Sequence, residues 1–560
     1  MDMETVSQIL MGHQQPSWDI FNATSAAAGP LRFLAALDQN DGSLVLPLLI
    51  LLPFFVVSLF RHYTNSAVVL TYNDDPASIR LFNQRTGKEQ SENLIDYILK
   101  KCPSLSDPAR GATFKPSIWM TSGHLQTAYA AYRDFNSIYK IPYERELLST
   151  PDGGTVSVDW APSVKTMPAD DTPTLVLLHG LTGGSHESYI RALVETMTKD
   201  HGYRCVVFNA RACANTELTS AQLYCGSWTD DLRMVVKHIR KTLPESKLMS
   251  VGFSLGANIL MNYMGEEGDQ CEFLGAMSVG NPFDLMGTCL AIERGWLGSK
   301  IYSPAMGGNL RRIFMKHTKW FENSDIVDVD LVLRGKSIRD FDDAVTRRVF
   351  KYRTVHEYYR MASSSQRILD IKRPFLCLNA LDDPIAVSEC LPRDEVKNNP
   401  FGLLATTARG GHLGWFEGFF SQRRWCTKPL AEFCIALFEA DRRSVSRTPS
   451  NKPKIVADVS TTENKKNQQD GNSGNPESHI VRNVKTLEHM DQGGATTMPL
   501  RNKMGAEQHT QKASHSQPHV DRQAIERRDK KNSLAIRSFS RKSFWATLLP
   551  LIVYYIMKRR

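Results

Sequence analysis

The sequence lacks the cysteine patterns that would assign it to several familiar classes. None of its ten cysteines forms a Cys-x-x-Cys pair, and their spacing shows no repeating framework. This argues against a thiolate zinc site, a thioredoxin-like redox motif and a disulfide-stapled scaffold. Cys205 and Cys377 lie in apolar runs and are expected to be buried core residues. Reduced thiols are therefore favoured, and a few disulfides on a lumenal domain stay open as the alternative.

The first 440 residues also lack the positive charge that the whole chain suggests. The chain has 560 residues with 68 Lys and Arg against 59 Asp and Glu, a net charge of +9, but residues 1–440 contain 45 basic and 48 acidic side chains. The surplus lies in residues 441–560. A nucleic-acid-binding protein would carry a basic face on a folded module, so no nucleic-acid partner is expected.

Long uncharged runs are scarce, and one stands out near the start. Residues 44–60 read LVLPLLILLPFFVVSLF, without a charge, which is at the lower limit for crossing a hydrocarbon core about 30 Å thick. The run begins too late for a signal peptide and lacks the polar period of a soluble core helix. We predict an N-terminal arm over 1–43 and a transmembrane helix over 44–60. The expected location is a single-pass membrane protein of the endoplasmic reticulum or lipid droplets, with a slight bias toward a cytoplasmic catalytic domain.

The C-terminal tail divides into two parts. Residues 441–540 are polar, basic and poor in aromatics, so they are predicted to form a disordered linker. Residues 541–560 carry an apolar stretch, FWATLLPLIVYYIM, between basic flanks. This pattern favours a segment held at the surface of anionic membrane lipid, with packing on the catalytic domain as the alternative.

Between about residues 140 and 440, short β-branched runs alternate with longer amphipathic stretches, which predicts an α/β fold with a mostly parallel sheet flanked by helices. The catalytic domain is predicted to span residues 110–440. The predicted strands are Thr174–Leu178, Arg204–Phe208, Lys247–Val251, Leu274–Val279, Pro374–Leu378 and Gly402–Thr406. The predicted helices include Tyr189–Lys199, Ser227–Thr242 and Gly256–Met264.

The third predicted strand runs directly into GFSLG, with Ser254 at its centre and an apolar helix after it. This strand–turn–helix context makes the motif a candidate nucleophile elbow. Small residues two positions before and after the serine let strand and helix approach. The helix N-terminus favours negative charge developing beside the serine.

A glycine-rich turn follows the first predicted strand and reads HGLTGG. In a serine hydrolase of this shape such a turn supplies one oxyanion-hole amide, and the residue after the nucleophile supplies the other. The candidates are the backbone N–H groups of Leu181 and Leu255. The turn lacks the Lys-Ser/Thr ending of a phosphate-binding loop, which argues against a nucleotide site.

The remaining triad members should follow the serine in the order acid, then histidine. Asp382 and Asp383 follow the fifth predicted strand, and His412 follows the sixth. Adjacent side chains on an extended backbone point in different directions, so only one aspartate can hold the imidazole. Asp383 is chosen, with Asp382 as the alternate. His412 would act as general base toward Ser254.

The segment between the fourth and fifth predicted strands is longer than one helix requires, so residues 283–370 are predicted to form a cap over the site. Its aromatic residues Trp296, Trp320, Phe321 and Tyr358 either line an apolar acyl pocket or form the core of the cap itself.

Several motifs together resemble one known group. They are GHLQT at Gly123–Thr127, HGLTGG, NARAC at Asn209–Cys213, GFSLGAN, LNALDDPI and GGHLGWFEG. The sequence over residues 110–440 is similar to the membrane-associated α/β-hydrolases that include the abhydrolase-domain proteins and the yeast medium-chain fatty-acid ethyl ester synthase/esterases (the AB hydrolase 4 family). The resemblance implies an α/β-hydrolase fold and Asp383 as triad acid. At Ala212 the family more often has glycine.

The resulting expectation is a membrane-anchored serine esterase or acyltransferase that carries a medium- or short-chain acyl group on Ser254. The expected substrates are an acyl ester or acyl-CoA together with an alcohol; no metal or organic cofactor is implied, and the oligomeric state is left open. The alternatives are a lipase or phospholipase acting on membrane lipids and a non-catalytic lipid-binding protein of the same fold.

Overall fold

The computed structural model describes residues 52–440 with short interruptions at 54, 59, 61–63, 65–66, 84–87, 107–111, 134, 136–137, 164–169, 323 and 419–422. The predicted arm over 1–43, most of the predicted transmembrane helix, the linker over 441–540 and the terminal segment over 541–560 lie outside the described residues. Within the part of the chain that is described, no helix is both long enough and apolar enough to cross a membrane.

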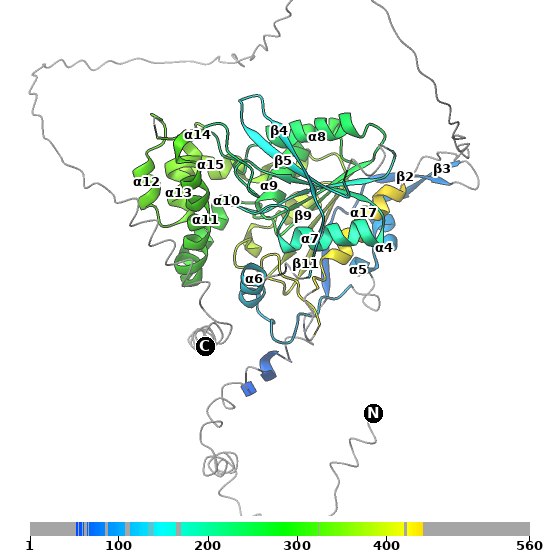
Figure 1. Cartoon of the computed structure of the whole chain (residues 1–560). Helices are drawn as coiled ribbons and strands as arrows, with labels where there is room; N and C mark the ends of the chain where they lie inside the picture. Colours follow the sequence, from blue (N-terminus) through cyan, green and yellow to red (C-terminus); the bar gives the residue numbers. More distant parts are fainter. Residues whose placement is uncertain are drawn as a thin grey trace, which may run out of the picture. The chain divides into compact units, whose positions relative to one another are not determined.

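A nine-stranded sheet forms the centre of the domain (Figure 1). Its spatial order is β1-β11-β10-β9-β8-β6-β7-β5-β4. The strands are β1 (Val68–Tyr72), β4 (Glu144–Ser149), β5 (Thr155–Ala161), β6 (Thr174–Leu178), β7 (Arg204–Asn209), β8 (Leu248–Phe253), β9 (Ala276–Val279), β10 (Phe375–Ala380) and β11 (Gly402–Thr407). The six central strands β11, β10, β9, β8, β6 and β7 pair in parallel. At the edges, β1 pairs antiparallel with β11, and β5 and β4 pair antiparallel beside β7. A separate hairpin joins β2 (Ser78–Asn83) to β3 (Lys88–Asn93).

The six predicted strands are the six parallel ones, and the prediction of a mostly parallel sheet is confirmed. Every residue of β6, β7, β8 and β10 is buried, as expected for strands covered on both faces and therefore continuously apolar. The edge strand β4 was missed because its ERELLS sequence alternates in burial and has no apolar run. Strand β1 pairs with β11, so the sheet extends to residues before 110.

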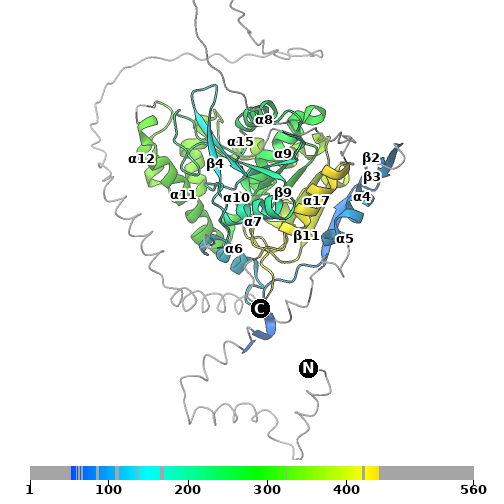
Figure 2. The same cartoon turned by 45° about the vertical axis from the view of Figure 1, so that its right-hand side comes forward.

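Helices cover both faces of the sheet (Figures 1 and 2). On one face α4 (Leu94–Lys101), α7 (Ser188–Glu195) and α17 (Thr427–Ala440) pack on Leu175 and Leu177 of β6. On the other face α8 (Asp230–Thr242) and α9 (Leu255–Glu267) pack on the alternate residues Val176 and Leu178, since successive strand side chains point to opposite faces.

The predicted helices agree with α7, α8 and α9 within a few residues, and α7 continues as the π-helix η1 (Thr196–Asp200). Further helices outside the cap are α5 (Pro103–Ser106), α6 (Gly123–Tyr132), η2 (Gly268–Gln270), η7 (Ser388–Cys390) and α16 (Arg393–Lys397).

All the regular elements between β9 and β10, the segment in which the cap is predicted, are helices, and they stand beside the sheet (Figure 1). Its elements are α10 (Leu285–Arg294), η3 (Gly298–Tyr302), α11 (Ser303–Lys316), η4 (Thr318–Trp320), α12 (Val329–Arg334), α13 (Ile338–Phe341), η5 (Asp342–Thr346), α14 (Arg347–Val349), α15 (Val355–Ala362) and η6 (Ser364–Asp370). The amides of Asn258 and Asn262 on α9 both donate to the carbonyl of Ala362, which ties the end of α15 to the helix behind Ser254.

The four cap aromatics have different surroundings. Phe321 is buried against Phe314, with ring centroids 4.9 Å apart. Tyr358 is also buried, and its hydroxyl accepts a hydrogen bond from the Gly226 N–H. Trp296 and Trp320 are exposed. Phe321 therefore contributes to the cap's own core and Tyr358 to its attachment.

Candidate active site

Ser254 occupies the sharp turn between β8 and α9. Its backbone has φ 52° and ψ −120°, a conformation that a non-glycine residue adopts only when the surrounding structure enforces it. The two flanking glycines explain how this turn fits. A Cβ on Gly252 would lie 2.5 Å from the Ala257 Cα, and one on Gly256 would lie 2.4 Å from the His179 carbonyl oxygen. The small residues of the motif are therefore required by contact with the helix and with the neighbouring strand.

The structure brings the three predicted triad side chains together. The Ser254 hydroxyl lies 2.8 Å from His412 Nε2, and His412 Nδ1 lies 2.9 Å from Asp383 Oδ2. Because a carboxylate only accepts, Nδ1 carries the proton and Nε2 is free to accept one from the serine. The second carboxylate oxygen, Oδ1, accepts hydrogen bonds from the backbone N–H groups of Ile385 and Ala386. These two bonds fix the orientation of the carboxylate independently of His412.

Asp382, the alternate acid, faces a different partner. Its Oδ1 accepts a hydrogen bond from the Gly411 N–H at 2.9 Å. A Cβ on Gly123 would lie 1.9 Å from the Asp382 carbonyl oxygen, so the start of α6 is packed directly on this loop. Burial raises the pKa of Asp382 to about 6. Asp382 thus anchors the residue before His412, while Asp383 reaches the imidazole.

The GHLQT segment forms the start of α6 and supports the histidine loop. The Thr127 hydroxyl accepts a hydrogen bond from the His412 N–H at 2.8 Å and donates to the Gly123 carbonyl. Gln126 holds the end of the same loop, because its Oε1 accepts from the Phe416 N–H at 2.8 Å. The sequence showed this motif without assigning it a role. Nothing in its spacing indicates which distant loop it supports.

The two predicted oxyanion-hole amides come from different parts of the chain: Leu181 lies in the turn after β6, and Leu255 directly follows Ser254. Leu255 is the first residue of α9, where a backbone N–H has no partner inside the helix. Leu181 follows the Gly180 turn, and a Cβ on Gly180 would lie 3.2 Å from the Ser254 Cβ. Within the described residues, neither the Leu181 N–H nor the Leu255 N–H donates a hydrogen bond, so both are available to a substrate oxygen.

Two partly buried tyrosines hold the turn around Leu181. The Tyr189 hydroxyl accepts from the Gly180 N–H at 3.0 Å, and the Tyr224 hydroxyl accepts from the Thr182 N–H at 2.7 Å. Thr182 has a φ of 58°, in the left-handed region that favours glycine. Both hydroxyls have their pKa raised by burial, which keeps them as neutral phenols. Sequence reasoning missed them because both lie outside the motifs.

His179 is a structural member of the same turn. Burial lowers its pKa to about 4, so the ring is neutral near pH 7. Its Nε2 accepts from the Ala210 N–H at 3.1 Å, and the proton on Nδ1 is therefore donated to the Gly180 carbonyl, 2.6 Å away. The ring joins the turn to the segment after β7.

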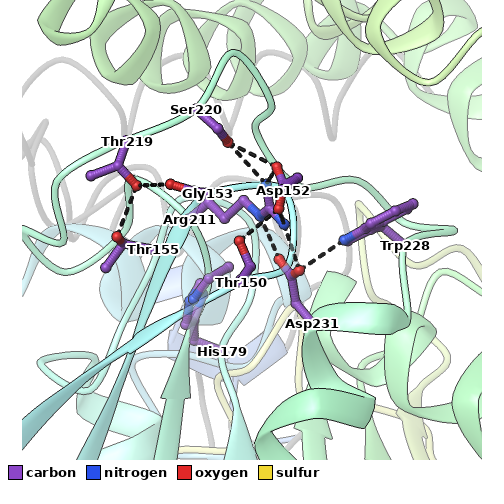
Figure 3. A network of polar contacts seen from close by, with 11 residues as sticks. Thr150, Asp152, Gly153, Thr155, His179, Arg211, Thr219, Ser220, Trp228 and Asp231 are labelled. Atoms are coloured by element: carbon purple, nitrogen blue, oxygen red, sulfur yellow. Dashed lines mark hydrogen bonds and ion pairs between the residues drawn. The ribbon is translucent and has the colours of Figure 1, made fainter. Parts of the chain in front are cut away.

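That segment is held by an ion network around the buried Arg211 (Figure 3). Arg211 pairs with Asp231 at 2.7 Å and with Asp152 at 2.6 Å, and the Trp228 indole donates to Asp231. The Arg211 hydrogen bonds lower the pKa of Asp152. Ala212 has a φ of 60°, in the left-handed region that favours glycine. This conformation costs an alanine about 1 kcal/mol, so the network holds a strained turn next to the residue that contacts His179.

The geometry suits acyl transfer through a serine nucleophile. A hydroxyl, an imidazole and a carboxylate form a continuous hydrogen-bonded series, and the two candidate oxyanion amides belong to the residues that follow Gly180 and Ser254. In the described part of the chain, no group of three or more His, Cys, Asp or Glu residues is placed to hold a metal ion. All ten cysteines are free thiols, nine of them buried.

Comparison with known proteins assigns the family. The α/β hydrolase fold model matches residues 173–297. A yeast (Saccharomyces cerevisiae) monoacylglycerol lipase is 38% identical over 399 residues, covering 64% of this chain and 88% of that protein. The human phospholipase ABHD3 is 32% identical, covering 62% of this chain and 83% of its own. The yeast medium-chain fatty acid ethyl ester synthase/esterase 2 is 28% identical, covering 66% and 95%. This chain therefore belongs to the α/β-hydrolase fold family, in the abhydrolase group of ester hydrolases that contains these lipases and esterases.

Proposed function

We propose that this protein is a serine hydrolase of lipid acyl esters that works through an acyl-enzyme on Ser254. The observation that carries the proposal is the hydrogen-bonded series from Ser254 Oγ through both nitrogens of His412 to Asp383. A protein that only binds lipid has no need for this alignment or for the strained backbone at Ser254.

In the proposed mechanism Ser254 Oγ attacks the ester carbonyl while His412 Nε2 takes the hydroxyl proton. The carbonyl oxygen becomes an oxyanion that accepts from the Leu181 and Leu255 amides. The C–O bond to the alcohol then breaks, and His412 returns the proton to the leaving oxygen. Water, deprotonated by the same nitrogen, releases the acid. Asp383 keeps Nδ1 protonated and stabilises the imidazolium throughout.

The acyl esters of glycerol are the favoured substrates. The 38% identical relative is named a monoacylglycerol lipase and the 32% identical relative a phospholipase. The near-neutral charge balance of residues 1–440 suits an uncharged ester. A second candidate, transfer of a medium-chain acyl group from acyl-CoA to an alcohol, draws on the relative named an ethyl ester synthase/esterase. The two reactions share the acyl-enzyme and differ in what attacks it.

A fluorophosphonate probe tests the nucleophile. The wild-type protein should be labelled, and Ser254→Ala should not. Labelling that survives Ser254→Ala, or no labelling of a folded wild type, would sink the enzyme proposal and leave the lipid-binding alternative.

A substrate panel tests the chemistry. Initial rates on a monoacylglycerol, a phospholipid, a medium-chain ethyl ester and medium-chain acyl-CoA with ethanol should be greatest on the monoacylglycerol. A preference for acyl-CoA with ethanol would favour the second candidate, and a preference for phospholipid would move the substrate to the bilayer lipid itself.

The proposed location is a membrane of the endoplasmic reticulum or a lipid droplet, with residues 44–60 as anchor and the basic-flanked residues 541–560 as a second attachment. Deleting 541–560 should weaken attachment to anionic vesicles, and the loss should be largest at low salt because salt screens the charge attraction. Unchanged attachment at low salt would contradict the second attachment.

A further inference from the structure

Five large apolar side chains around α6 are exposed on the surface of the domain. They come from three stretches of the chain, residues 119–132, residues 296–301 and residue 381, and their exposed fractions run from 38% to 57%. We call this set the α6 rim: Trp119, Tyr132, Trp296, Ile301 and Leu381. Singly exposed apolar residues are ordinary, but a gathered set marks a contact surface.

Side-chain contacts bring these segments together. Trp119 precedes α6 and Tyr132 ends it. Tyr302, next to Ile301, lies 2.7 Å from His124 Nδ1 of α6 through its hydroxyl, which places the η3 turn of the cap against this helix. Both views show α6 beside the end of α11 that follows η3 (Figures 1 and 2).

The rim also adjoins the candidate active site. The start of α6 packs on the backbone of Asp382 at Gly123, and Leu381 is the residue before that aspartate. On the same helix, Thr127 holds His412. A surface seated on this rim would therefore lie next to the loops that carry the triad acid and base.

The end of the uncharged run reaches the same place. The Phe55 ring lies 6.1 Å from the Trp119 ring, and the Thr121 hydroxyl lies 3.3 Å from that of Ser58. The apolar residues of this segment that face away from the domain are 46% to 67% exposed: Leu52, Val56, Val57 and Phe60. The chain thus enters the domain at the rim, at the end of 17 residues without a charge.

We infer that the α6 rim and the exposed side chains of Leu52, Val56, Val57 and Phe60 form one lipid-docking surface, which turns the triad toward the membrane from which its substrate comes. This inference rests on the proposed function. Tryptophan and tyrosine suit such a surface because their rings are both apolar and polar. The exposed cations Arg294 and Lys300 adjoin Trp296 and Ile301 along the chain, where they can meet anionic headgroups.

The test compares two forms of substrate on the full chain. The double variant Trp119→Ser, Trp296→Ser should lose at least about tenfold in rate on a monoacylglycerol held in phosphatidylcholine–phosphatidylserine vesicles. Its rate on dissolved p-nitrophenyl butyrate should fall far less. The matched control is Leu147→Ser, which removes an exposed leucine from the edge strand β4 and should change neither rate. Both variants should still float with vesicles, because residues 44–60 are intact.

Fluorescence gives a readout that does not depend on catalysis. Brominated phosphatidylcholine should quench the part of the emission that Trp119→Phe removes. Equal losses of the double variant on both substrates, or an unquenched Trp119, would overturn the docking surface. Quenching that appears only after residues 541–560 are deleted would show that these residues cover the rim. A dimer that the double variant dissociates would show that a second copy of the chain covers it. Either result would also overturn the lipid-docking surface. If Ser254 takes no fluorophosphonate yet Trp119 is quenched, the proposed function fails and the surface stands.

Discussion

Replacing Asp383 with asparagine is the sharpest test of how the two adjacent aspartates divide their roles. Asparagine preserves the shape, and its carbonyl can still accept from the Ile385 and Ala386 N–H groups. Its amide nitrogen then faces His412 Nδ1, 2.9 Å from the present carboxylate oxygen. Since the amide donates, Nδ1 must become the acceptor and the proton must move to Nε2. The imidazole then presents an N–H to Ser254 and cannot take the hydroxyl proton.

The size of the effect follows from this wrong tautomer. We expect kcat on a soluble ester to fall by about 10⁴-fold, equivalent to about 5 kcal/mol of transition-state stabilisation. The matched control is Asp382→Asn, which keeps an acceptor for the Gly411 N–H and should stay within about threefold of wild type, equivalent to about 0.6 kcal/mol. The assay is steady-state hydrolysis together with the rate of fluorophosphonate labelling. An Asp383→Asn variant within tenfold of wild type, or an Asp382→Asn variant equally impaired, would refute the assignment.

Two further substitutions test the supports of the site, and a third tests a buried carboxyl group of the cap. Thr127→Val leaves the His412 N–H without its acceptor at a cost of about 1–3 kcal/mol, so kcat/KM should fall about 10- to 100-fold while Thr127→Ser restores it. Tyr224→Phe removes the acceptor of the Thr182 N–H and should lower kcat about tenfold with little change in KM; a lost melting transition instead would indicate misfolding. Burial raises the pKa of Asp342 from 3.8 to about 6, so its contribution to stability is complete below about pH 4 and is lost as the pH rises through 6. Asp342→Asn should therefore raise the free energy of unfolding at pH 8 by up to about 3 kcal/mol and leave it nearly unchanged at pH 4, as measured in urea; equal effects at both pH values would contradict this.

The parallel part of the fold was readable because its strands are buried on both faces. A strand such as β7 is buried along its whole length and therefore reads as a continuous apolar run. The turns after β6 and β8 carry glycines whose contacts leave no room for a Cβ, and these glycines mark the strand ends in the sequence. The antiparallel edges were not readable. In β4 every second residue faces solvent, so its sequence resembles that of many loops.

Some residues of the candidate active site could be predicted from the sequence, and others could not. Ser254, Asp383 and His412 were indicated by residue type, order and position after strands, because the carboxyl ends of parallel strands meet at one edge of a sheet. The roles of Thr127, Asp382 and Tyr224 depend on contacts between segments up to 285 residues apart. Their types alone are as common in caps and cores as in active sites.

The sequence by itself determined the order of the strands along the chain, the strained turn at Ser254 and the set of groups that can perform acyl transfer, because these depend on local backbone preferences and residue chemistry. Only the tertiary structure decided which aspartate meets the imidazole, which amides remain open beside the serine and which exposed side chains gather around α6. Those outcomes depend on directions and distances between segments that no local pattern encodes, and they are set when the sheet, the helices and the cap pack together.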